Sequence, residues 1–201
     1  MNFRNTKLLE EGKLLLSFDS YWLSDAEQMR DFIYISEPVI RNGEYYAGIF
    51  ASPKHPSIFS VKSIGDLRKY TAASTPKWKT DWETLESLSL KELIREDEWV
   101  SQAQMVSKML VDFIMMPFHA SISEIYKLDN IELKPVPDIA LLLNDSRHFV
   151  VSKKHPLGRE VFKALSDGLL QLREVGQIEK AYKEAGFMID MSAYHILNLT
   201  E

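Results

Sequence analysis

The stretch SRHFVVSKKHPLGREVFKALSDGLLQLREVGQIEKAYKEAGF, residues 146–187, decides the fold class. It opens with aromatic and β-branched residues at 149–152, which favour a short strand. Pro156 is a suitable first residue for the helix that follows. The apolar residues of that helix recur at helical spacing and are Val161, Phe162, Leu165, Leu169 and Leu172. Gly176 interrupts the helix, and Gly186 ends a second, shorter one. A strand that feeds amphipathic helices is typical of an α/β protein.

Outward from this stretch, strand-like and helix-like segments continue to alternate. Short runs of aromatic and branched residues predict further strands at 45–50, 69–73, 112–116 and 139–143. Ser24 and Glu27 have the spacing of a capping box, which predicts a short helix over residues 24–30. The charged run REDE at residues 95–98 is expected to form a solvated loop. The alternation again indicates an α/β protein.

A strand, a tight turn and a helix are predicted around Ser74 to Lys77. Pro76 suits the first position of a helix, and Thr75 is then the expected N-cap residue. One apolar face of that helix holds Trp78, Trp82 and Leu85. Ser74, Thr75 and Lys77 surround the predicted helix N-terminus, where free N–H groups attract anions. These three residues are candidate ligand contacts, and helix capping without a ligand is the alternative.

Composition and charge exclude several classes of function. The chain of 201 residues is 45% hydrophobic and 26% charged, enough for a buried core and a soluble surface. Its net charge of −5 argues against a nucleic-acid partner, which normally meets a basic surface. The absence of cysteine excludes disulfides, zinc–thiolate sites and thiol nucleophiles. The histidines lack metal-ligand spacing, so neither a metal nor another cofactor is expected.

No catalytic or targeting motif stands out. A nucleophile elbow, a phosphate-binding glycine loop and a dinucleotide fingerprint are all missing, so we predict that the protein is not an enzyme. Asp19 or Asp25 could be nominated as a catalytic carboxylate, but nothing in the sequence marks either one. The first residues show no basic and apolar signal segment, which predicts a cytoplasmic location if Met1 is the true start.

Several segments together resemble one known family. They are LLEEGKLLLSF at 8–18, SDAEQMRDFIYISEPV at 24–39, YYAGIFASP at 45–53, SIGDLRKYTAAST at 63–75, MVSKMLVDFIMM at 105–116 and the ending at 146–187. In this order and spacing they resemble the family 3 extracellular solute-binding proteins of bacterial ABC importers. That family has the type II periplasmic binding protein fold. No single segment is diagnostic, and the ending matches best.

The resemblance implies an α/β fold with two lobes, a hinge and an incomplete first lobe. Lobe 1 is expected from residues 1–45 plus 155–201, and lobe 2 from residues 46–154. Two crossing strands near 45–50 and 149–152 would form the hinge. A small polar solute, either amino-acid-like or a small carboxylate, would bind in the cleft between the lobes. The implied partner is an ABC permease, and the implied location is the periplasm.

The sequence also departs from the family pattern. The chain begins within lobe 1, and the apolar surface left exposed there would favour a homodimer. The slot for the family's carboxylate-binding arginine falls on Met29, and Arg30 comes one residue later, a turn of about 100° on a helix. The slot for an amino-group-binding aspartate falls on Pro117. A truncated or diverged copy, acting as a sensory or interaction module or binding no ligand, is therefore the alternative function.

Four further residues are candidate ligand contacts. Tyr21 and Trp22 lie in a segment that lines the cleft in the family, where aromatic rings stack on ligands; packing within the lobe is the alternative. Arg30 is a candidate partner for a ligand carboxylate, or else an ordinary surface partner of Glu27. His119 follows a predicted strand and faces the cleft if the resemblance holds, although a single histidine is more often structural.

Overall fold

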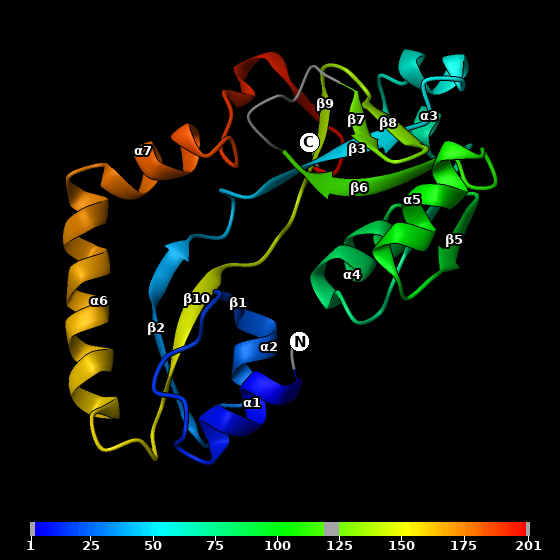
Figure 1. Ribbon diagram of the computed structural model, residues 1–201. Coiled ribbons are helices and arrows are strands. Elements are labelled where there is room, and N and C mark those ends of the chain that lie inside the picture. Colours follow the sequence, from blue (N-terminus) through cyan, green and yellow to red (C-terminus); the bar gives the residue numbers. More distant parts are fainter. Residues whose placement is uncertain (1–2, 119–124, 200–201) are drawn as a thin grey trace. The chain divides into compact units, whose positions relative to one another are not determined.

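The computed structural model describes residues 3–118 and 125–199 (Figure 1). His119, one of the candidate contacts, lies outside these residues. The chain divides into two compact units: residues 1–45 with 144–182, and residues 46–143 with 183–201. We call them unit 1 and unit 2. The lobes expected from the sequence differ from these units in where residues 144–154 and 183–201 belong.

Unit 1 is built on a three-stranded sheet. Its order is β1 (Tyr21–Trp22), β10 (Arg147–Ser152) and β2 (Ile33–Ile40), with both pairs antiparallel. The central strand β10 shifts register after Arg147 and again after His148. Strand β2 was not predicted, because charge and proline at its centre disguise a segment whose buried residues do not alternate simply.

The helices of unit 1 are α1 (Phe3–Glu10), α2 (Leu23–Glu27), α6 (Gly158–Glu174) and the first part of α7 (Gln177–Glu184). Helix α6 packs on β2 and β10, as its apolar stripe predicts. It begins two residues after the expected Pro156. Gly158 has to be a glycine, because a Cβ there would lie 2.0 Å from the Ser152 carbonyl oxygen.

The capping-box spacing placed the N-cap of α2 at Ser24, two residues later than the structure has it. Ser24 lies inside α2, whose N-cap residue is Trp22. The Trp22 side chain makes no capping hydrogen bond to the helix. The Ser24 N–H instead donates to Asp145 Oδ2 at 3.3 Å. A carboxylate distant in sequence therefore serves the free N–H groups that the capping box was expected to serve.

Unit 2 is built on a larger mixed sheet with the strand order β11-β9-β3-β6-β4-β5. Strand β3 pairs antiparallel with β6 and β9, whereas β4 pairs parallel with both β5 and β6. The strand bounds are β3 Tyr46–Ala51, β4 Thr71–Ser74, β5 Glu92–Arg95, β6 Phe113–Pro117, β7 Tyr126–Leu128, β8 Ile131–Pro135, β9 Ile139–Leu142 and β11 His195–Ile196. The helices are η1 Pro56–Ser60, α3 Ile64–Leu67, α4 Lys79–Ser87, α5 Trp99–Ser107 and η2 Met191–Ala193.

Each unit has its own apolar core. In unit 1, Leu9, Ala26, Ile33 and Val150 bring α1, α2, β2 and β10 together. In unit 2, α5 packs on the sheet through Ala103 and Val106. These two residues belong to a buried cluster of Phe50, Ala73, Ala103, Val106, Val111, Ile114, Met116, Ile131 and Leu133. Separate cores of this kind stabilise each unit from within.

Asp112 holds the start of the central strands of unit 2 in register. Its Oδ2 accepts from the Thr71 N–H at 2.7 Å and the Thr71 hydroxyl at 2.8 Å, and its Oδ1 lies 2.7 Å from His55 Nε2. Burial alone would raise the pKa of Asp112, but these hydrogen bonds outweigh it and lower that pKa. The carboxylate thus fixes β4 against β6, with its other end toward the loop that carries His55.

Candidate functional site

The carboxyl ends of β4 and β5 bring polar side chains together in unit 2. The two strands are parallel, and their last residues, Ser74 and Arg95, are register partners. The residues that follow each strand, Thr75 and Asp97 among them, therefore leave the sheet at the same edge. This edge is the usual place for ligands in open α/β sheets.

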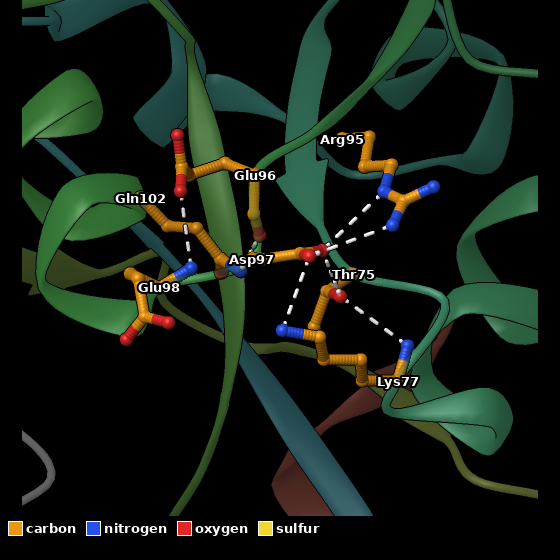
Figure 2. A network of polar contacts seen from close by, with 7 residues as sticks. All are labelled: Thr75, Lys77, Arg95, Glu96, Asp97, Glu98 and Gln102. Carbon is orange, nitrogen blue, oxygen red and sulfur yellow. Dashed lines mark hydrogen bonds and ion pairs between the residues drawn. The ribbon is translucent and has the colours of Figure 1, made fainter.

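Asp97 is the centre of a network of polar contacts (Figure 2). The Thr75 hydroxyl donates to Asp97 Oδ1 at 2.8 Å. Lys77 Nζ lies 3.1 Å from Asp97 Oδ2, and Arg95 Nε lies 3.3 Å from Oδ1. The hydrogen bond from Thr75, then those from Arg95 and Lys77, hold the pKa of Asp97 far below its ordinary value. Asp97 is therefore ionised at every pH at which the protein would normally be handled.

The backbone beneath the network is fixed by further bonds. The Glu96 N–H donates to the Ser74 carbonyl at 3.0 Å, and Gln102 Nε2 donates to the Glu96 carbonyl at 2.7 Å. Gln102 is buried, with 2% of its surface exposed. The Glu98 N–H donates to Glu96 Oε1 at 3.0 Å. Because α5 supplies Gln102, the loop after β5 is tied both to β4 and to the helix that follows it.

Thr75 plays a different part from the one expected. Helix α4 begins at Lys79 with Trp78 as N-cap residue, so Thr75 is not its cap. The Trp78 N–H donates to the Thr75 carbonyl at 3.0 Å, which closes a turn over residues 75–78 before the helix starts. The fully buried Thr75 hydroxyl accepts from the Lys77 N–H at 3.2 Å and donates a hydrogen bond to Asp97 Oδ1. The Thr75 hydroxyl, which was expected to cap the helix, is therefore hydrogen-bonded to the Asp97 carboxylate, 22 residues away in the sequence.

The structure brings together two of the three candidates in this segment. Thr75 and Lys77 both contact Asp97, while Ser74 is buried as the last residue of β4. The expectation of a solvated loop at residues 95–98 is wrong for Arg95, which ends β5. Residues 96–98 do form a loop, and within it Asp97 organises the network (Figure 2). Sequence reasoning missed Asp97 because its partner Thr75 is 22 residues away and the short strand β5 was not recognised.

The candidates in unit 1 each have different partners within the chain. Tyr21 makes a hydrogen bond to Thr6, and burial raises the pKa of its hydroxyl. Trp22 lies under the Arg147 guanidinium, whose central carbon is 5.0 Å from the ring centroid. Arg30 pairs with Glu27 at 3.4 Å on the surface, where 70% of its side chain is exposed. The structure thus places an arginine beside Trp22, but it is Arg147 and not Arg30.

Neither metal-binding nor membrane-spanning features appear in the part of the chain that the structure describes. Within residues 3–118 and 125–199, no three histidine or acidic side chains are grouped as a metal ion would need. Among the described helices, none has the length and apolar character required to cross a membrane.

Comparison with solved structures shows that other proteins have a similar fold. Substrate-binding domain 2 of GlnP from Lactococcus lactis is 14% identical, with a TM-score of 0.58, over 94% of this chain and 75% of that one. The L-cystine solute receptor of Neisseria gonorrhoeae is 16% identical, with a TM-score of 0.56, over 94% and 76%. The GluR0 ligand-binding core in complex with L-glutamate is 16% identical, with a TM-score of 0.61, over 90% and 76%.

The chain has the fold of solute-binding proteins. The α/β class and the periplasmic binding protein-like fold expected from the resemblance are confirmed. The chain spans about three quarters of the length of these structures. No protein-family model matches the sequence, and no curated protein matches it. The likeness at this level of identity concerns the fold, and the similar structures named here are binding proteins rather than enzymes.

Proposed function

We propose that the protein binds a small polar solute, amino-acid-like or a small carboxylate, at the Asp97 network of unit 2. The observation that carries the proposal is the convergence of Thr75, Lys77 and Arg95 on Asp97, where two parallel strands end (Figure 2). Structures with the same fold supply further support. They include a receptor for L-cystine, a ligand-binding core in complex with L-glutamate and a substrate-binding protein bound to L-arginine.

The network has complementary places for a solute with charges of both signs. The Lys77 and Arg95 side chains remain 58% and 64% exposed, so they keep donors for an incoming carboxylate. Such a carboxylate would compete with Asp97 for these two cations. The Glu96 and Glu98 carboxylates lie in the same loop and would attract a cationic group. Arrangements of this kind favour a zwitterion over a neutral sugar.

The proposal extends to a role in solute transport. One similar structure is an amino acid ABC transporter substrate-binding protein from Streptococcus pneumoniae, bound to L-arginine. By analogy, the protein would hand its solute to an ABC permease outside the cytoplasm. A non-transport role, as a sensory or interaction module, is the alternative. A homodimer formed through unit 1 also stays a prediction, which light scattering after gel filtration would test.

A thermal-shift screen tests the proposed function. The purified chain is heated with amino acids, small carboxylates and sugars, because a ligand that binds only the folded state raises the melting temperature. At a concentration about 100 times Kd, the stabilisation is about 2.7 kcal/mol, which corresponds to a rise of about 5 °C or more for a protein of this size. The Thr75→Ala, Lys77→Ala double variant is expected to lose this rise.

Lys79→Ala is the matched control, because Lys79 pairs with Glu83 at 3.9 Å and not with Asp97. Its ligand-induced rise should equal that of the wild type. The rise is measured within each variant, so a lower melting temperature of the double variant without ligand does not confuse the result. If no compound shifts the wild type although it melts cooperatively, the non-binding alternative replaces the proposal.

A further inference from the structure

Unit 1 contains an arginine, Arg147, that has no counter-charge among the residues that the structure describes. Arg147 is the first residue of the central strand β10, and its Cα is a register partner of both Trp22 and Ile40. The side chain is partly buried. In the part of the chain that the structure describes, no carboxylate forms an ion pair with it. This arginine is thus removed from much of the solvent without the partner that a buried cation normally has.

Two contacts hold the Arg147 side chain in place. Its Nη2 donates to the Ser20 carbonyl at 2.6 Å, and its guanidinium lies over the Trp22 ring at 5.0 Å from the centroid. The Nε atom is enclosed and has no hydrogen-bond partner among the described residues. A guanidinium has five N–H donors, and the contacts within the chain use few of them. Position and orientation are therefore fixed while hydrogen-bonding capacity remains.

Arg173 shows how the same unit treats an arginine with a structural role. Its Nη1 lies 2.8 Å from Glu44 Oε1, and its Nη2 donates to the Val39 carbonyl at 2.9 Å. Only 15% of the Arg173 side chain is exposed. Both arginines act on the hydroxyl of Tyr182, where burial raises the pKa and the two positive charges oppose that rise. Arg147, like Arg173, donates to a backbone carbonyl and acts on Tyr182, but no carboxylate among the described residues pairs with it as Glu44 pairs with Arg173.

Aromatic rings complete the surroundings of Arg147. Trp22 meets Tyr45 edge to face, with ring centroids 5.3 Å apart. Tyr45 is buried, with 6% of its surface exposed, and so backs the Trp22 ring from within the unit. A ring that is held rigidly under a guanidinium keeps the plane of the guanidinium fixed. A planar cation held in this way is suited to a planar anion.

We infer that Arg147, positioned by Trp22 and the Ser20 carbonyl, binds the carboxylate group of a small molecule. Because Nε is enclosed, the contact is made at the Nη end of the guanidinium. A carboxylate accepts two N–H donors from such a fork, supplies the missing negative charge and matches its plane. The inference goes beyond the proposed function, since its residues belong to unit 1 and not to the Asp97 network.

Matched pairs of compounds test the inference on the full chain. We would measure Kd by calorimetry for L-arginine and agmatine, L-glutamate and γ-aminobutyrate, and L-cystine and cystamine, since each second compound lacks an α-carboxylate of the first. The wild type is expected to prefer at least one carboxylate by about 10- to 100-fold, as for a hydrogen bond to a charged group. In Arg147→Met that preference should fall to nearly one.

Two further variants separate a binding role from a structural one. Arg147→Lys keeps the charge but not the planar fork and should retain part of the preference. Arg159→Met, the same change at an exposed residue of α6, should leave it unaltered. The inference is overturned if the wild type does not distinguish the members of any pair, or if Arg147→Met and Arg147→Lys keep the full preference. In the second case, loss of binding in the Thr75→Ala, Lys77→Ala variant would leave the proposed function standing.

Discussion

The two units satisfy their positive charges in different ways. In unit 2, Lys77 and Arg95 share the carboxylate of Asp97, which also receives the Thr75 hydroxyl. In unit 1, Arg147 lies on Trp22 with a backbone carbonyl as its hydrogen-bond acceptor. The first arrangement is complete without a ligand, and a solute has to compete with Asp97. The second is incomplete, so an added anion improves it directly.

This difference between the units indicates that a charge paired within the chain contributes to stability, whereas a charge without an ion pair is available for binding a ligand. Removing one partner of an internal pair leaves the other partner unsatisfied, and that cost appears as lost stability. Removing a charge that has no partner leaves little behind, and its loss appears only when a ligand is present. The predictions below use this contrast, and they run from the largest expected effect to the smallest.

The largest effect is expected from Arg173→Met compared with Arg147→Met. The first change leaves Glu44 and the Val39 carbonyl without their donor, and should lower the free energy of unfolding by about 2–3 kcal/mol. The second should stay within about 1 kcal/mol of the wild type, because no carboxylate loses a partner. Urea denaturation measures both. Equal losses would show that Arg147 has a structural role after all.

Thr75→Val comes next, because it removes only the hydroxyl from the network in unit 2. The free energy of unfolding should fall by about 1 kcal/mol, since a fully buried residue loses its bonds to Asp97 and to the Lys77 N–H. The pKa of Asp97 should rise toward its ordinary value, because the largest cause of its lowering is gone. Carbon-detected NMR titration of the carboxylate measures the pKa. An unchanged pKa would mean that Lys77 and Arg95 alone suffice.

These contacts also show how far the sequence alone could lead. Periodicity predicted α6 and α7, because their apolar faces recur at helical spacing in a continuous stretch. Strand β5 and residue Asp97 escaped prediction, because four residues between charged neighbours carry too little pattern. Arg147 could not be found at all, since its acceptor at Ser20 lies 127 residues away. The local sequence pattern determines which segments form helices and strands. The pairing of strands that are distant in sequence determines which side chains come into contact.

The pH dependence of Asp97 gives a smaller effect with a definite sign. Its folded pKa lies below the unfolded value of about 3.9, so its contribution to stability is present above that value. The contribution is lost as the pH falls through the folded pKa. The difference in stability between the wild type and Asp97→Asn should therefore be constant from about pH 5 to pH 8 and should shrink below about pH 4. Denaturation at several pH values measures it, and a difference that grew on acidification would contradict the network.

The smallest effect on stability is expected from Arg30→Met. The Arg30–Glu27 pair is exposed at 70% and 51%, with a separation of 3.4 Å, so its loss should change the free energy of unfolding by less than about 0.5 kcal/mol. The same variant decides between two arginines. If the preference for L-arginine over agmatine falls in Arg30→Met and persists in Arg147→Met, the carboxylate is held where the family resemblance places it. The opposite result assigns the carboxylate to Arg147, which forms no ion pair with a carboxylate of the described residues, whereas Arg30 would have to give up Glu27.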